Sequence, residues 1–144
     1  MDFSIKTLAA KSTAADNAST IKTACIVVGV FENKKLSTSA TQLNKKGAID
    51  AALKSGDISG KVGSTLMLRN LAEVSAERVL LVGLGEDPNK VSEKAYISAV
   101  QNAARGLNNL GGADVSLVLP EVDGRDLAWA IRQTVIAFKE AIFR

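Results

Sequence analysis

Residues 79–89 read VLLVGLGEDPN, and this stretch decides how the rest of the chain can fold. Its first residues are aliphatic without interruption, which is typical of a strand covered on both faces of a sheet. Gly83 and Gly85 then break the strand, as glycines do where many nucleotide-binding loops begin. The turn either holds a phosphate or only ends the strand.

The residues after Gly85 argue against a dinucleotide loop. The fingerprint needs a third glycine and a helix that opens directly after the strand. Here Pro88 stands at the third glycine position, and Glu86 and Asp87 place two negative charges where a pyrophosphate would lie. The next helical pattern starts late, near Ser92. The sequence therefore predicts a tight strand-to-loop turn.

A second glycine-rich segment, residues 56–64 (GDISGKVGS), resembles a phosphate loop only superficially. That loop needs four residues between its glycines and a Ser or Thr after the lysine. Gly56 and Gly60 enclose three residues, and Val62 follows Lys61. The segment also follows a helix, so we expect no phosphate loop here.

Strand and helix patterns alternate along the chain. Strands are predicted at residues 3–6, 24–31, 64–70, 77–85 and 113–120, and helices at residues 48–55, 92–110 and from 123 to the end. Residues 32–47 are predicted to form a polar connection. This alternation predicts an α/β domain of three layers, with a mixed, mostly parallel sheet between helices.

The last predicted helix carries two apolar faces. The face expected to pack on the sheet consists of Leu127, Ile131, Val135, Phe138 and Ile142. The second face, expected to meet a partner or another domain, consists of Trp129, Ile136 and Phe143.

Composition limits the chemistry that the chain can perform. A length of 144 residues, with 47% hydrophobic and 4% aromatic residues, suits one domain, residues 1–144, with an aliphatic core. There is no histidine, which excludes a Ser-His-Asp triad and a Cys/His zinc site. The single cysteine, Cys25, lies in an apolar run and is expected to be an inert core residue. No catalytic, cofactor-binding or metal-binding residue is assigned.

The charge of the chain suggests no particular partner, and its N-terminus suggests the cytoplasm. The net charge of +3 is mild, and acidic residues are interspersed with basic ones, so a solvated face is the simplest interpretation. The N-terminus lacks the pattern of a signal peptide, and no apolar run approaches the ~20 residues that span a bilayer. We expect a cytoplasmic protein without membrane contact.

Four segments in order resemble the N-terminal domain of the leucyl aminopeptidases, the cytosol aminopeptidase family. They are GAIDAALKSGDISGKVGSTLML (47–68), AERVLLVGLGE (76–86), KAYISAVQNAARGL (94–107) and WAIRQTVIAFKEAIFR (129–144). Each glycine turn is common by itself, but their order and spacing are more specific. The resemblance covers residues 3–144.

The resemblance implies a macro-domain-like fold and a non-catalytic role. Family members are cytoplasmic, hexameric exopeptidases that release N-terminal residues from peptides. Their catalytic C-terminal domain holds two divalent metals, zinc or manganese. This chain ends at Arg144, about where the family passes into the connection to that domain, and lacks its motifs. The resemblance thus implies a domain that serves hexamer assembly or substrate access, with its own C-terminal domain as partner.

Two alternatives stay open. Some bacterial family members resemble proteins that also bind DNA in recombination or transcription control, and here phosphate contacts would come from Lys34, Lys35, Lys45, Lys46 and Lys61. The macro-domain-like fold suggests, by analogy alone, a ligand of the ADP-ribose type.

Overall fold

The computed structural model describes residues 4–7, 25–32, 36, 38–44, 47–56, 58–69, 71, 74–86, 91–107, 114–118 and 127–142. Within them the chain forms β1 (Ser4–Thr7), β2 (Cys25–Val30), α1 (Thr38–Leu43), α2 (Ala48–Ser55), β3 (Thr65–Arg69), β4 (Arg78–Gly83), α3 (Glu93–Leu107), β5 (Asp114–Val118) and α4 (Leu127–Ile142).

The strands form one mixed sheet in the order β1-β5-β2-β4-β3. The first four strands run parallel, and β3 is antiparallel to β4 at the edge. β2 lies at the centre and is buried along its whole length, as its continuous apolar run predicted. The predicted mixed, mostly parallel sheet is confirmed.

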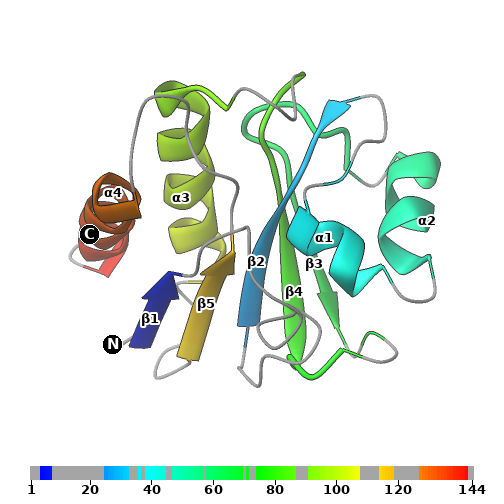
Figure 1. The fold of residues 1–144 in the computed structure, drawn as a ribbon, viewed down its shortest axis with the longest axis horizontal. Coiled ribbons are helices and arrows are strands. Elements are labelled where there is room, and N and C mark those ends of the chain that lie inside the picture. The colour runs from blue at the N-terminus through cyan, green and yellow to red at the C-terminus, as the bar shows by residue number, and fades with distance from the viewer. Residues whose placement is uncertain are drawn as a thin grey trace.

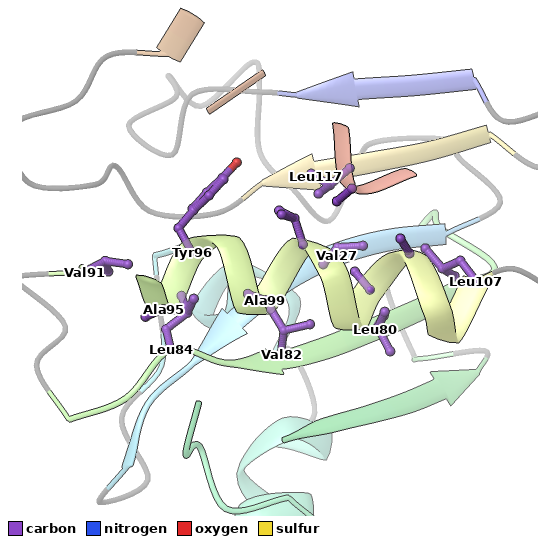
Figure 2. Close-up of a cluster of buried hydrophobic side chains, with 14 of the residues drawn as sticks. Val27, Leu80, Val82, Leu84, Val91, Ala95, Tyr96, Ala99, Leu107 and Leu117 are labelled. Atoms are coloured by element: carbon purple, nitrogen blue, oxygen red, sulfur yellow. The ribbon is translucent and has the colours of Figure 1, made fainter. Parts of the chain in front are cut away.

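Helices cover both faces of the sheet, which gives the predicted three layers (Figure 1). Alternate residues of β2 serve the two faces: Val27 joins the core under α3, whereas Ile26 and Val28 join the core under α1 and α2. Figure 2 shows Val27, Leu80 and Val82 of the sheet gathered against Ala99 of α3. The core under α1 and α2 is aliphatic, as the composition implied, whereas the core under α3 also holds Phe31 and Tyr96.

The helix ends show which local signals were correct. Ser92 Oγ accepts a hydrogen bond from the Ala95 N–H at 3.1 Å, so Ser92 caps α3 as predicted. Gly56 ends α2 in the left-handed conformation, with φ of 83°. The sequence also predicts that Gly111 and Gly112 stop α3 and that Asp123 and Asp126 open the last helix. All four residues lie outside the described part of the chain.

The prediction that residues 32–47 form only a polar connection is wrong, because α1 lies within them. This helix has six residues, and Ala40 and Leu43 are the buried ones among those whose burial the structure describes. One apolar pair is too short for helical periodicity to be recognised in a sequence. Asn44, just after α1, accepts bonds from the N–H groups of Ile49 (3.1 Å) and Asp50 (3.3 Å), and so caps α2 from outside the helix.

The prediction for the inward face of α4 is also wrong. Thr134 and Ala137 are buried, whereas Ile131 and Val135 are 41% and 38% exposed. Small side chains on the inner face let α4 approach α3, where Tyr96 fills the space between the helices. The side chains of Leu127, Phe138 and Ile142 lie outside the described part.

The residues of the second predicted face of α4 differ in their exposure. Trp129 packs partly buried against the core, with its ring centroid 5.5 Å from that of Tyr96, so part of its surface serves the interior of this domain and its partner-facing role stays a prediction. Ile136 is 45% exposed, as that assignment required. Phe143 is not among the described residues.

Candidate functional site

The first candidate site is the edge of the sheet where β2 and β4 end. Ligands of open α/β sheets bind outside the carboxyl ends of parallel strands, and both strands end at this edge. β2 leads into Phe31 and Glu32, and β4 leads into the turn Gly83–Leu84–Gly85. The loop of residues 58–64, which precedes β3, crosses the same edge. We call these three segments the glycine junction.

Backbone hydrogen bonds close the glycine junction. The Gly83 N–H donates to the Ser64 carbonyl at 2.8 Å, and the Gly85 N–H donates to the Gly60 carbonyl at 3.0 Å. The Leu84 N–H donates to the Val30 carbonyl at 2.9 Å. All three amide donors of the turn are therefore used within the chain, and a phosphate could take them only by displacing these bonds.

Steric contact explains why two of these positions are glycine. A Cβ on Gly83 would overlap the Lys61 carbonyl oxygen and Ser64 Oγ. A Cβ on Gly60 would overlap the backbone of Phe31, and Gly60 also has φ of 83°. The glycines that suggested a nucleotide loop thus permit two stretches of backbone to pack together.

The tip of the loop of residues 58–64 is exposed to solvent. The Lys61 carbonyl accepts bonds from the Ser64 N–H at 3.0 Å and from Ser64 Oγ at 2.6 Å, which fixes the turn between them. Lys61 and Val62 are exposed at this tip. Lys61 is the one proposed DNA-contacting residue in the described part of the chain, since Lys34, Lys35, Lys45 and Lys46 lie outside it. The structure therefore does not test whether the five lysines form one site, and DNA binding stays a prediction.

Two buried groups have shifted pKa values. Burial raises the pKa of the Cys25 thiol from 9.0 to about 11, against smaller lowering effects of the Leu80 backbone and the Arg78 charge. Burial also raises the pKa of Tyr96, opposed by its hydrogen bond with Thr134. Both groups therefore stay protonated at neutral pH, and a protonated thiol is a poor nucleophile.

Metal ligands do not cluster in the described part of the chain. No group of three or more Cys, His, Asp or Glu side chains is placed there to hold an ion. Among the described helices, none has the length and apolar character that crossing a bilayer would need.

The second candidate site is the outer surface of α4. Among the described residues, the exposed large hydrophobic side chains are Val62, Ile131, Val135 and Ile136. Three of these four belong to α4, and Ile131 and Val135 lie one turn apart on one face. The sequence showed that α4 has more apolar surface than one interface needs, but it did not show which side faces outward.

Comparison with known proteins places the chain among peptidase relatives. The family model described as the N-terminal domain of the cytosol aminopeptidase family matches residues 27–144. A probable cytosol aminopeptidase of Alkalilimnicola ehrlichii is 44% identical over 131 residues, covering 88% of this chain and 26% of the relative. One from Nitrosomonas europaea is 37% identical over 148 aligned residues, covering 100% of this chain and 28% of the relative. The chain thus spans about a quarter of the length of these relatives.

A solved structure supports the fold. The macrodomain of Mycobacterium tuberculosis DarG is similar to this chain with a TM-score of 0.68, covering 96% of this chain and 92% of that chain. The two sequences are 15% identical, so the likeness concerns the fold alone. The predicted macro-domain-like α/β fold is confirmed.

Proposed function

This chain belongs to the cytosol aminopeptidase family, as its N-terminal domain, and from this we propose that it serves as the non-catalytic accessory domain of a cytoplasmic leucyl aminopeptidase. The observation that carries the proposal is the family match over residues 27–144, together with relatives of which the chain covers only 26–28%. The parent would release N-terminal residues from peptides. The relatives are probable cytosol aminopeptidases, which supports the cytosolic location.

The catalytic metals belong to the rest of the proposed parent. Two divalent ions, zinc or manganese, would polarise the scissile carbonyl and activate water there. The described residues of this chain do not fit such a centre, because no cluster of three potential ligands occurs among them. We therefore assign this domain no part in the chemical step.

The glycine junction supports a structural role. Its turn donors are used by neighbouring carbonyls and its glycines are filled by neighbouring backbone, so the strand ends form a closed surface. A rigid domain of this kind can hold subunits in a hexamer, or narrow the entrance to a catalytic domain. These are the two roles that we propose for it.

The test compares the full-length protein with a version that lacks this domain. Sedimentation velocity would report the oligomer, and hydrolysis of a dipeptide and of a longer peptide would report substrate access. Loss of the hexamer indicates the assembly role. Faster cleavage of the longer peptide, with dipeptide cleavage unchanged, indicates the access role. If oligomer and length preference both stay unchanged, the proposal is wrong, and if the full-length protein cleaves no peptide, the parent is not an aminopeptidase.

DNA binding is the second proposal, and the exposed position of Lys61 is the observation in its favour. Binding through phosphates would weaken steeply with salt. Titration of the chain with random and promoter-like duplexes at two salt concentrations tests it, with all five lysines changed to Gln as the comparison. Affinity that does not change in that variant would remove the assignment. The closed turn and the exposed Glu86 disfavour the ADP-ribose alternative at this edge.

A further inference from the structure

The strand β3 forms one edge of the sheet (Figure 1). Among the helices and strands that the structure describes, only β4 runs closely alongside it. Thr65 and Arg69, at the two ends of β3, are exposed, and the three apolar residues between them are partly exposed. An edge strand of this kind offers a row of backbone donors and acceptors to a further strand.

The contact with β4 decides which backbone groups of β3 point away from the sheet. The Gly83 N–H donates to the Ser64 carbonyl at 2.8 Å, directly before β3 begins. Because backbone groups alternate in direction along a strand, every second residue from Ser64 onward directs its groups toward β4. The outward N–H and C=O groups therefore belong to Thr65, Met67 and Arg69. Within the described part of the chain, no backbone hydrogen bond outside the sheet uses them.

The strand β3 has few of the features that protect an edge from pairing. Prolines, bulges and inward-pointing charges are the usual means of protection. Residues 65–69 read TLMLR, which contains no proline and a single charge, Arg69, at its end. The pairing of β3 with β4 also runs without a bulge. The edge is therefore suited to accept another strand.

The sequence of β3 is complementary to itself. When two copies of β3 pair antiparallel about a two-fold axis at Met67, each Met67 lies opposite its own counterpart. Leu66 then lies opposite Leu68 of the second copy. Thr65 lies opposite Arg69 of the second copy, so the two arginines are kept apart. The outward backbone groups at positions 65, 67 and 69 all find partners in this register.

Other pairings use the edge less well. Met67 is the middle residue of β3, so an axis at any other position leaves part of the strand unpaired. An axis at Arg69 would also place two like charges directly opposite, which is unfavourable. Pairing of β3 with β1 of another copy would leave a free edge at each end and could propagate, whereas the two-fold pair is closed.

We infer that β3 is a contact surface between two copies of this chain, which pair edge to edge about a two-fold axis at Met67 and so join their sheets. The inference goes beyond the assembly role proposed above, because it names a surface and a symmetry and uses only residues of this chain. A strand pair of five residues is small beside a standard interface of about 800 Å² per partner, so we expect weak association that covalent trapping can detect.

The test traps the pair with engineered disulfides. Residues opposite each other in a hydrogen-bonded pair have Cα atoms about 5.5 Å apart, which a disulfide can bridge, so Met67→Cys should link to its own copy under mild oxidation. Thr65→Cys is the matched control, because the two copies of Thr65 would lie about 14 Å apart, beyond the reach of a disulfide. Thr65 is more exposed than Met67, so random collisions would favour the control instead.

Linked dimer is measured on non-reducing gels over a range of protein concentrations. Met67→Cys should give at least about tenfold more linked dimer than Thr65→Cys at equal times, because pairing raises the effective concentration of the facing thiols. The native Cys25 is fully buried and contributes little. An equal or larger yield for Thr65→Cys would overturn the inference, as would the absence of linked dimer in both variants.

A second experiment leaves Met67 intact, in case its replacement impairs folding. A mixture of Thr65→Cys and Arg69→Cys chains should give the mixed dimer in preference to either self-linked dimer, since these two positions face each other across the axis. A mixture that yields no mixed dimer would overturn the inference. Both experiments use this chain alone, so their failure leaves the comparison of full-length and shortened protein as a separate test of the proposed function.

Discussion

Tyr96 of α3 and Thr134 of α4 lie 38 residues apart in sequence, yet their hydroxyl oxygens are 3.3 Å apart in the buried contact between the two helices. Thr134 Oγ1 donates to the Ala130 carbonyl at 2.8 Å, so it accepts from Tyr96, which is the donor of the pair. Both hydroxyls are thereby satisfied away from water. The bond fixes the position of α4 along α3.

We expect removal of the Tyr96 hydroxyl and removal of the Thr134 hydroxyl to lower the free energy of unfolding by different amounts. Tyr96→Phe should lower the free energy of unfolding by about 0.5–1.5 kcal/mol, because Thr134 keeps its bond to Ala130. Thr134→Val should cost more, about 1–3 kcal/mol, because the Tyr96 hydroxyl is left buried without its acceptor. Urea unfolding of both single variants and the double variant measures the coupling. Equal losses in the two single variants would contradict the assigned donor.

Gly83→Ala should destabilise the domain by about 3 kcal/mol or more. The added methyl group would overlap the Lys61 carbonyl oxygen, and a backbone atom cannot rotate away as an overpacked side chain can. Gly106→Ala in α3 is the control. There the nearest atom to the new Cβ is Leu80 Cδ2 at 4.0 Å, so the variant should gain about 0.5–1 kcal/mol from helix propensity. Thermal unfolding of both variants checks this, and a neutral Gly83→Ala would show that the junction is open.

The free energy of unfolding should fall at alkaline pH because the buried Cys25 thiol resists ionisation. The folded pKa of about 11 exceeds the unfolded value of 9.0, so this contribution is complete below pH 9 and is lost as pH rises toward 11. Between pH 8 and 10 the loss should be about 1.4 kcal/mol, one pKa unit of linkage. Unfolding of the native chain and of Cys25→Ala at several pH values measures it. Cys25→Ala is expected to have a lower free energy of unfolding at every pH but a weaker dependence on pH. Parallel curves of this free energy against pH for the two proteins would contradict the raised pKa of Cys25.

The two sides of α4 should respond differently to charge. Val135→Asp is expected to lower the free energy of unfolding by no more than about 1 kcal/mol, because Val135 is 38% exposed and the carboxylate can reach water. Ala137→Asp should cost about 3 kcal/mol or more, since Ala137 is only 5% exposed and the carboxylate would be buried without a partner. Denaturant unfolding of the isolated chain separates these outcomes. A larger loss for Val135→Asp than for Ala137→Asp would mean that Val135 faces inward, as the sequence first predicted.

The parts of the fold that the sequence predicted have strong local signals. The continuous aliphatic runs of β2 and β4 admit few alternatives to buried strands, and Ser92 and Gly56 mark helix ends by well-understood capping. The helix α1 was missed because its six residues include only two apolar ones, Ala40 and Leu43.

The inward side of α4 was misjudged for a different reason. Hydrophobic periodicity favours the side with the largest apolar residues, but packing against Tyr96 selected the side with small ones, Ala130, Thr134 and Ala137. The glycine junction was likewise predicted only in part. Residue spacing excluded a phosphate motif, but the bonds between segments distant in sequence exist only in the folded chain.

The closed glycine junction also has a practical consequence. Its hydrogen bonds join main-chain atoms, apart from those of the Ser59 and Ser64 hydroxyls, so the side chains of Lys61 and Val62 at its tip take no part in these bonds. A dye or a short epitope attached there would be carried by a stiff support with little effect on the fold. The tip is thus a natural reporter position, from which the distance to a second label on α4 would report motion within this domain.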